Sequence, residues 1–204
     1  MKKKYIIAFF VILIIFLFIA YKNKNLGNNN NSSDKVNILN ISSYDAVVEI
    51  EVFSNKNKNK YLIHQQYIKP NIFKQEIIEP ENFKGLTTTF DGTNLIIENS
   101  NLGLNMLYEK YDCFQGNSLS LIRFLEELKE NKDYKMEDKE EEIIITIKTE
   151  GKNKYEAYKK MYINKKNNLP TKMEIIDINQ NVTVYILYKE ININETRIND
   201  VLVK

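Results

Sequence analysis

The side chains that could carry acid–base, nucleophilic or metal chemistry are few in this 204-residue sequence. His64 is the only histidine and Cys113 the only cysteine. With one of each, and no local carboxylate–histidine spacing, the chain cannot assemble a zinc site of the usual kinds. A lone histidine on a strand is far more often a surface or packed residue than a ligand. Cys113 excludes an intrachain disulfide framework and is interpreted as a small, partly buried side chain.

Carboxylates are numerous, but their surroundings favour structural roles. The run Glu137–Glu142 is predicted to be a solvated edge or loop, since it lacks the glycine turn and spaced ligands of a calcium site. Asp91 stands beside Gly92, which is typical of a tight turn rather than of an acid catalyst. Only six glycines are scattered over the chain, so no phosphate-binding loop is present. We therefore predict a protein that is not an enzyme, with no catalytic, metal-binding or cofactor-binding residues and no cofactor.

The charge pattern argues against nucleic acid as a partner. All 27 acidic residues lie after Ser33, together with 24 of the 29 basic ones, so this part of the chain is three charges negative. A protein that grips nucleic acid is expected to carry a basic face. The sequence shows none.

The N-terminus predicts a membrane anchor. Tyr5–Tyr21 contains no charge and no proline, and seventeen helical residues span roughly 26 Å, enough for a bilayer core of about 30 Å. Phe18 and Tyr21 disfavour signal cleavage, and no lipid-attachment cysteine follows. Lys2–Lys4 favour a cytoplasmic N-terminus. We expect an anchor or uncleaved signal at 1–21, a flexible polar linker at 22–33, and an extracytoplasmic domain at 34–204 held at the cytoplasmic membrane.

The domain is predicted to be mostly sheet. Alternation of apolar and polar residues places Ala46, Val48, Ile50 and Val52 on one face of a first strand. One helix is predicted in Ser118–Asn131, capped by Asn117 or Ser118, and a short helix is predicted at Asp34–Ile41. The predicted strands are Tyr44–Phe53, Tyr61–Ile68, Ile72–Glu79, Leu86–Phe90, Asn94–Glu98, Leu102–Tyr108, Ile143–Thr149, Tyr155–Asn164, Thr171–Ile178 and Val182–Glu190.

These elements indicate the α+β class. Most connections are too short for a crossover helix, so antiparallel pairing is favoured. A single sheet of nine or ten strands should twist and curl. We predict a strongly curved antiparallel sheet whose concave side is covered by one or two helices, in addition to the N-terminal transmembrane helix.

The order of several motifs resembles a known superfamily. They are Y…Q-Q-Y-x-x-P-x-x-F-K-x-E from Tyr61 to Glu76, E-P-E-N-F-K-G from Glu79, F-D-G from Phe90, and L-P-T-K-M-E-I from Leu169. Together they resemble the lipoprotein carriers LolA and LolB, and within that superfamily the clostridial spore germination lipoproteins, GerS. The resemblance implies an incomplete β-barrel closed by helices. The chain departs from the pattern at Tyr21, where GerS-type proteins carry a cysteine, and at Lys74, where the carriers commonly place an arginine.

Two functions remain open. The resemblance to GerS implies a partner or scaffold for an exported cell-wall amidase that modifies spore cortex peptidoglycan during germination. Alternatively, the hollow of the sheet binds a hydrophobic ligand, such as the acyl chains of a lipoprotein. A membrane-tethered sensor fits less well, because only four residues precede the helix. Six residues are candidates for a hydrophobic cavity or its lid, or for side chains that fill it: Phe90, Met106, Leu121, Phe124, Leu125 and Leu128.

Overall fold

The computed structural model describes residues 40–54, 57–111, 118–131, 133–149, 153–195 and 201. They belong to one compact unit, Ile38–Lys204. The predicted anchor at 5–21, the linker at 22–33, most of the short helix predicted at Asp34–Ile41, and Cys113 lie outside these residues. Within the described residues, no helix combines the length and the apolarity that a bilayer crossing requires.

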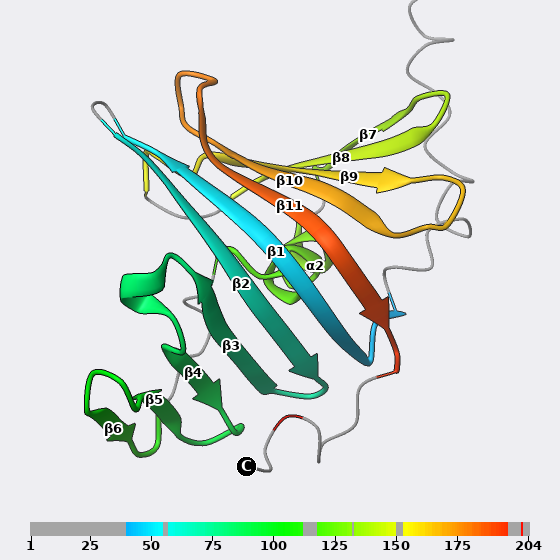
Figure 1. The fold of residues 1–204 in the computed structure, drawn as a ribbon. Coiled ribbons are helices and arrows are strands. Elements are labelled where there is room, and N and C mark those ends of the chain that lie inside the picture. The colour runs from blue at the N-terminus through cyan, green and yellow to red at the C-terminus, as the bar shows by residue number, and fades with distance from the viewer. Residues whose placement is uncertain are drawn as a thin grey trace, which may run out of the picture. The chain divides into compact units, whose positions relative to one another are not determined.

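One antiparallel sheet of eleven strands forms the described structure, in the order β6-β5-β4-β3-β2-β1-β11-β10-β9-β8-β7 (Figure 1). Strands that neighbour each other in the sheet are also consecutive in the chain, except that β1 pairs with β11 at the centre of the sheet. The sheet is open, because β6 and β7 each pair on one side only. The strands are β1 (Ser43–Phe53), β2 (Lys58–Ile68), β3 (Ile72–Glu79), β4 (Thr87–Phe90), β5 (Leu95–Asn99), β6 (Leu104–Tyr108), β7 (Lys135–Asp138), β8 (Glu142–Lys148), β9 (Tyr158–Asn164), β10 (Pro170–Ile176) and β11 (Val182–Ile193).

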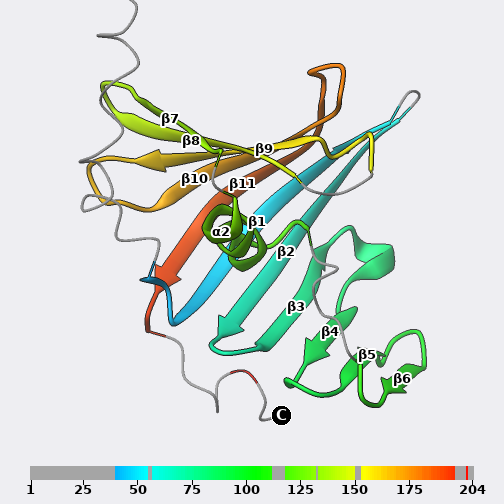
Figure 2. The same ribbon diagram turned by 180° about the vertical axis from the view of Figure 1, so that it is seen from behind.

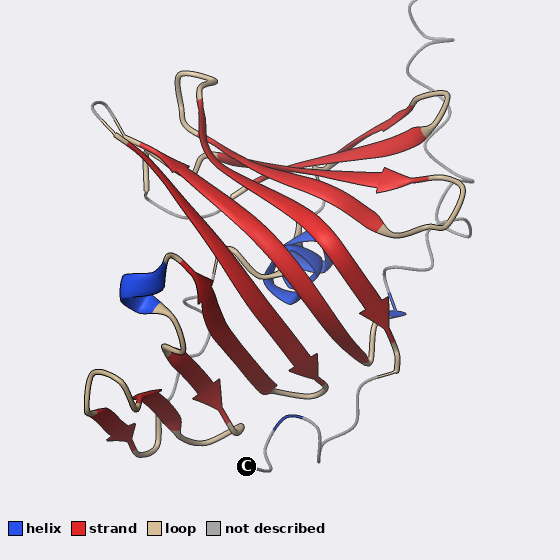
Figure 3. Ribbon diagram, in the orientation of Figure 1, coloured by secondary structure: helices blue, strands red, loops and turns tan. Residues whose placement is uncertain are grey.

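Helix α2 (Leu121–Glu130) lies in the concave side of the curved sheet, where Figure 2 shows it nearly end-on. A single short 3-10 turn, η3 (Glu81–Phe83), joins β3 to β4 on the described part of the chain, as Figure 3 shows. The predicted α+β class, the antiparallel curved sheet and the covering helix are confirmed. The predicted transmembrane helix stays a prediction.

The alternation predicted for the first strand is confirmed. Ala46, Val48 and Ile50 are at most 2% exposed and face the concave side, while Val52 is partly buried near the end of β1. The turn at Asp91 and Gly92 is also confirmed: the Asp91 Oδ1 atom accepts hydrogen bonds from the backbone nitrogens of Thr93 and Asn94 at 2.8 and 2.7 Å. Gly92 has a φ of 97°, which glycine adopts without strain.

One local prediction needs correction. The helix begins after Ser120, whose Oγ accepts a hydrogen bond from the Arg123 nitrogen at 3.3 Å; Ser118 lies in the preceding turn. The solvated edge or loop predicted for the acidic run is confirmed, since the run lies on the edge of the sheet and in the exposed loop at 139–141. Glu137 and Asp138 belong to edge strand β7, and Glu142 begins β8. Pairing with β8 holds this segment extended despite its charges.

Candidate functional site

His64 lies on the convex face of the sheet, opposite α2. Its Nε2 atom is 2.8 Å from the Asp45 Oδ1 atom, and the Gln66 amide donates to the Asp45 Oδ2 atom at 2.7 Å. The side chains of His64 and Asp45 are 33% and 34% exposed, so they sit on an open surface rather than in a cleft. This cluster links β1 to β2. Among the described residues, no group of three or more histidine, cysteine, aspartate or glutamate side chains is placed to hold a metal.

The carboxylates that the sequence brings forward have structural partners. The Glu137 carboxylate lies 3.0 Å from the Lys135 Nζ atom and 3.1 Å from that of Lys139, and these two hydrogen bonds lower its pKa. The pKa of Asp91 is lowered chiefly by the hydrogen bond from the Asn94 backbone. A general acid at neutral pH needs a raised pKa, so the shifts run opposite to what acid catalysis requires.

The hollow beneath α2 is filled by side chains. Leu121, Phe124, Leu125 and Leu128, four of the predicted cavity or lid residues, are between 0% and 8% exposed. They face a sheet surface that contributes fully buried residues, among them Met161, Met173 and Ile186. The predicted residues therefore form packed core at this position.

This core includes one buried charged residue, Lys159. The Lys159 side chain, on β9, is 0% exposed, and its Nζ atom lies 2.8 Å from the Glu127 Oε2 atom of α2 and 3.0 Å from Glu156. Glu127 is also bound by the Arg123 Nε atom at 3.0 Å. A buried lysine is tolerated only when its charge is paired, so this cluster fixes the position of α2 over the β9 side of the sheet.

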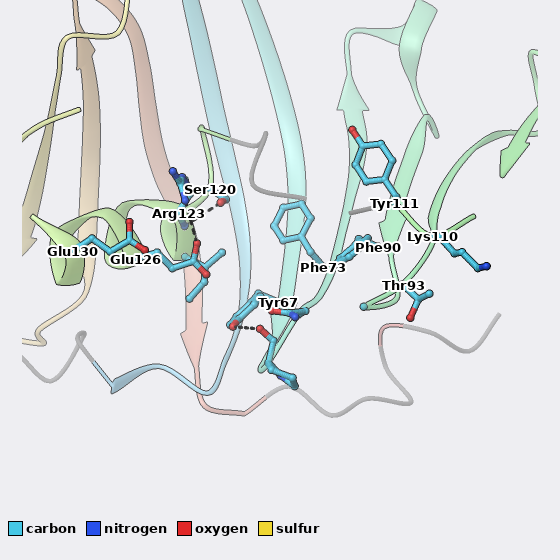
Figure 4. Close-up of a pocket in the computed structure, with 14 residues that line it drawn as sticks. Tyr67, Phe73, Phe90, Thr93, Lys110, Tyr111, Ser120, Arg123, Glu126 and Glu130 are labelled. Carbon is cyan, nitrogen blue, oxygen red and sulfur yellow. Dashed lines mark hydrogen bonds and ion pairs between the residues drawn. The ribbon is translucent and has the colours of Figure 1, made fainter. Parts of the chain in front are cut away.

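The other flank of α2 is open and forms a pocket of about 630 Å³. Buried aromatic rings of Tyr67, Phe73 and Phe90 stand between the helix and the first half of the sheet (Figure 4). The remaining lining residues are mostly polar and come from α2, from the β2–β3 turn, and from segments beside β4 and β6: Pro70, Asn71, Gly92, Thr93, Lys110, Tyr111, Ser120, Ile122, Arg123, Glu126 and Glu130. The pocket thus combines an apolar floor with a polar rim, a combination found in ligand sites.

Tyr67 is oriented by the turn that follows β2. Its hydroxyl donates a hydrogen bond to the Pro70 carbonyl oxygen at 2.9 Å, and its ring stacks on Tyr44 with centroids 5.8 Å apart. Burial, with a smaller contribution from the Glu126 charge, raises the pKa of Tyr67 to about 12. Tyr67 therefore stays protonated at neutral pH and can only offer hydrogen bonds and aromatic contact.

Of the six predicted cavity residues, Phe90 alone lines the pocket. Met106 is 41% exposed on β6, at the end of the sheet remote from α2 in both ribbon views (Figures 1 and 2). The sequence did not lead us to the polar residues of α2 that line the pocket. Arg123, Glu126 and Glu130 recur along one side of α2, adjacent to its buried leucines, and that polar stripe at helical spacing was a usable signal.

A second unassigned feature is the apolar surface around β6. Met106, Leu107 and Tyr108 are 41%, 55% and 41% exposed. Leu102 before the strand and Tyr111 after it are also exposed, at 60% and 39%. We call these five residues the β6 patch.

The comparisons with known proteins place the chain in a family. The model of a family described as sporulation protein YdcC-like matches residues 2–201. The chain belongs to this family. No curated protein matches the sequence.

Solved structures share its fold. An uncharacterized conserved protein from Thermus thermophilus aligns with a TM-score of 0.53 and 12% identity, over 82% of this chain and 88% of that one. The structure of the CwlD amidase from Clostridioides difficile in complex with the GerS lipoprotein aligns with a TM-score of 0.51 and 21% identity, over 80% of this chain and 96% of the matched chain. The LolA superfamily protein NE2245 from Nitrosomonas europaea aligns with a TM-score of 0.43 and 11% identity, over 84% of this chain and 95% of that one. The predicted resemblance to GerS is confirmed at the level of the fold.

Proposed function

We propose that this YdcC-like domain is a non-catalytic binding module that holds an exported protein partner, a cell-wall hydrolase of the spore cortex being the first candidate. The observation that carries the proposal is the β6 patch, a group of exposed apolar and aromatic side chains on one edge of the sheet. Exposed apolar residues along an edge strand favour association, and aromatic residues and methionine are enriched in protein interfaces.

The family and the fold support the same reading. The family is one of sporulation proteins. GerS, which shares the fold, is a lipoprotein solved in complex with an amidase. In this proposal the apolar segment Tyr5–Tyr21 holds the domain at the outer face of the cytoplasmic membrane, and the partner performs the chemistry.

The test is co-purification of the full-length chain, extracted in mild detergent from sporulating cells, followed by reconstitution with each purified cell-wall hydrolase that accompanies it. We expect a stoichiometric complex with one hydrolase. We expect the Leu107→Lys variant to weaken this complex at least tenfold and the Ile178→Lys variant, at another exposed apolar residue, to leave it unchanged. The full-length chain alone should leave cortex peptidoglycan intact. Cleavage by the pure chain, or the absence of any hydrolase complex, would contradict the proposal.

The pocket beside α2 favours a second candidate function, the binding of a hydrophobic ligand. Its aromatic floor and its volume of about 630 Å³ are compatible with a small apolar molecule. Directly beneath α2, the buried side chains of Leu121, Phe124, Leu125 and Leu128 occupy the interior. Native mass spectrometry of the full-length chain tests this reading. A bound lipid that is lost in a Phe90→Lys variant would support it, and a mass equal to that of the polypeptide in every preparation would oppose it.

A further inference from the structure

The outer side of β6 has backbone groups that the described sheet does not use. β6 pairs with β5, from Leu95 opposite Tyr108 to Asn99 opposite Leu104, and it ends the strand order. In an antiparallel pair, alternate residues direct their N–H and C=O groups away from the neighbouring strand. No described strand pairs with those groups on the outer side of β6. They can therefore accept another strand.

The side chains of this edge carry no charge that would oppose the pairing of such a strand. No charged residue occurs from Asn99 to Tyr108. Protected edges usually carry charges, proline or a covering element. The opposite edge, β7, does carry charges: Lys135, Glu137 and Asp138 occupy three of its four positions. Because β6 offers no charge to compensate, a strand paired with it should be uncharged where it faces the patch.

The end of β6 leads directly to the pocket. The Lys110 nitrogen donates a hydrogen bond to the Asn94 Oδ1 atom at 3.3 Å, and the Tyr111 nitrogen donates one to the Thr93 carbonyl at 2.8 Å. Lys110, Tyr111 and Thr93 all line the pocket. The rings of Tyr108 and Tyr111 have centroids 6.4 Å apart, so aromatic surface continues from the strand to the pocket rim. A segment laid along β6 therefore ends at the opening of a cavity with an aromatic floor.

We propose that β6 binds an extended, uncharged segment of a partner protein as an additional strand, and that this segment places one apolar side chain in the pocket beside α2. Main-chain hydrogen bonds to β6 supply affinity, and side chains on alternate positions supply specificity. One face of the segment contacts Met106 and Tyr108, which share a face of β6, and the other contacts Leu107. The anchor side chain is aromatic or long and aliphatic, because Tyr67, Phe73 and Phe90 form the floor that it meets. The identity of the partner as an exported hydrolase rests on the proposed function; the mode of binding does not.

A displayed library of twelve-residue peptides tests this mode without knowledge of the partner. The full-length chain in mild detergent is the bait, and a Met106→Lys, Leu107→Lys double variant is used for counter-selection. We expect enriched peptides in which apolar residues alternate, with at least tenfold weaker binding to the double variant and unchanged binding to Ile178→Lys. A Phe90→Lys variant should weaken the peptides that carry the anchor side chain. Met106 and Leu107 are 41% and 55% exposed, so we expect the double variant to keep the fold, which circular dichroism checks. Phe90 is 6% exposed, so the Phe90→Lys variant is compared only after circular dichroism shows that its fold is unchanged.

Hydrogen exchange then distinguishes strand addition from a side-chain contact. Amides in 104–108 that are not bonded to β5 should exchange at least tenfold more slowly when the peptide is bound. Peptides that bind the double variant equally well, or complexes in which these amides exchange as in the free chain, would overturn the proposal. Self-association of the chain that the double variant abolishes would also overturn it, since the occupant would then be a second copy. If peptides bind β6 but no hydrolase does, only the proposed function fails. If a hydrolase complex is weakened by Leu107→Lys but no peptide protects the outer amides of β6, only this inference fails.

Discussion

The two edge strands of the described sheet, β6 and β7, differ in the charge of their side chains. At the β7 end, the edge is covered with ion pairs: Glu137 lies within 3.1 Å of two lysines, and the Lys165 Nζ atom lies 2.6 Å from Asp138. At the β6 end, Met106, Leu107 and Tyr108 are exposed and no charge interrupts the strand. Charges on an edge discourage pairing with other chains. In the described sheet, the β7 edge is therefore protected by charge and the β6 edge is not.

The same asymmetry holds on the concave side. Toward β9, α2 is fixed by the buried ion pair between Glu127 and Lys159. Toward β3 and β4, the flank of α2 borders the pocket and makes contact through side chains that are partly exposed, such as Ile122 and Arg123. Stability should therefore depend on the side of α2 that packs toward β9, and binding on the side that borders the pocket.

The largest expected effect is that of Phe124→Ala. Phe124 is 0% exposed at the centre of the closed core, and replacement of a buried phenylalanine by alanine costs about 3–5 kcal/mol, because it removes apolar contact and leaves a cavity. The matched variant on the open side is Ile122→Ala, which should cost about 1 kcal/mol, since its side chain is only partly buried. Urea unfolding measures both free energies. Equal losses at the two positions would show that α2 is not packed asymmetrically.

The next effect is that of Lys159→Met. Removal of one partner from a buried ion pair leaves an uncompensated charge, and we expect a loss of about 3 kcal/mol, the lower end of the usual range, because Arg123 still pairs with Glu127. A double variant, Lys159→Met with Glu127→Gln, should recover much of that loss, since the α2 carboxylate is then neutral and the remaining Glu156 is 21% exposed. The double-mutant cycle is measured by urea unfolding. Additive losses would mean that the two side chains do not interact.

The sequence is sufficient for the elements that local pattern determines. The alternation of Ala46, Val48 and Ile50, and the turn at Asp91, depend on the covalent neighbours alone, and both are predicted correctly. The start of α2 is misplaced because Ser118 and Ser120 have the same capping chemistry, so only the backbone geometry decides between them. Strand β7 is not recognised as a strand because Met136 is the only apolar residue in it, and its conformation comes from pairing with β8.

The candidate site is less predictable, because it depends on where α2 sits across the sheet. The leucines of the helix are assigned to the interior correctly, but whether they fill or line a cavity is a property of packing. Met106 shares a face of the sheet with Ile97, its partner across β5 and β6, yet it lies beyond the part that α2 covers. No local pattern gives the distance between a strand and a helix that are remote in the sequence.

A smaller effect, in the stabilising direction, is expected for Tyr188→Phe. The Tyr188 hydroxyl is buried and has no hydrogen-bond partner among the described residues. Its removal should stabilise the protein by about 1 kcal/mol, because an unpaired buried polar group carries an uncompensated desolvation cost. The matched variant Tyr162→Phe should instead lose about 1 kcal/mol, because the Tyr162 hydroxyl donates to the Glu174 Oε2 atom at 3.0 Å. Thermal unfolding measures the change in stability that each variant causes. Destabilisation by both substitutions would contradict this account of Tyr188.

The alkaline limb of the stability profile gives an independent check on Tyr188. Burial raises the pKa of Tyr188 above its ordinary value near 10, and burial raises that of Tyr67 to about 12. In the unfolded chain these groups ionise first, so their protonated forms stabilise the fold below about pH 10 and this contribution is lost as the pH rises further. The Tyr188→Phe variant should lose less stability than the unmodified protein between about pH 10 and 12. If the free energy of unfolding falls equally for both proteins over that range, the Tyr188 pKa is not raised.

The smallest changes in stability should come from exchanging the characters of the two edges. Leu107→Lys on β6 and Glu137→Val on β7 both alter largely exposed side chains or exposed ion pairs, so each should change the free energy of unfolding by about 0.5 kcal/mol or less. Their effects on self-association should nevertheless differ. Glu137→Val removes the charge that Lys135 and Lys139 share and adds a residue that favours strands, so β7 should begin to self-associate with rising concentration. Leu107→Lys should leave the self-association of the chain unchanged, because the proposed occupant of β6 is another protein. Analytical ultracentrifugation measures the association of both variants. If Glu137→Val associates no more than the unmodified chain, charge does not protect β7. The contrast between the two edges would then come from their backbone geometry.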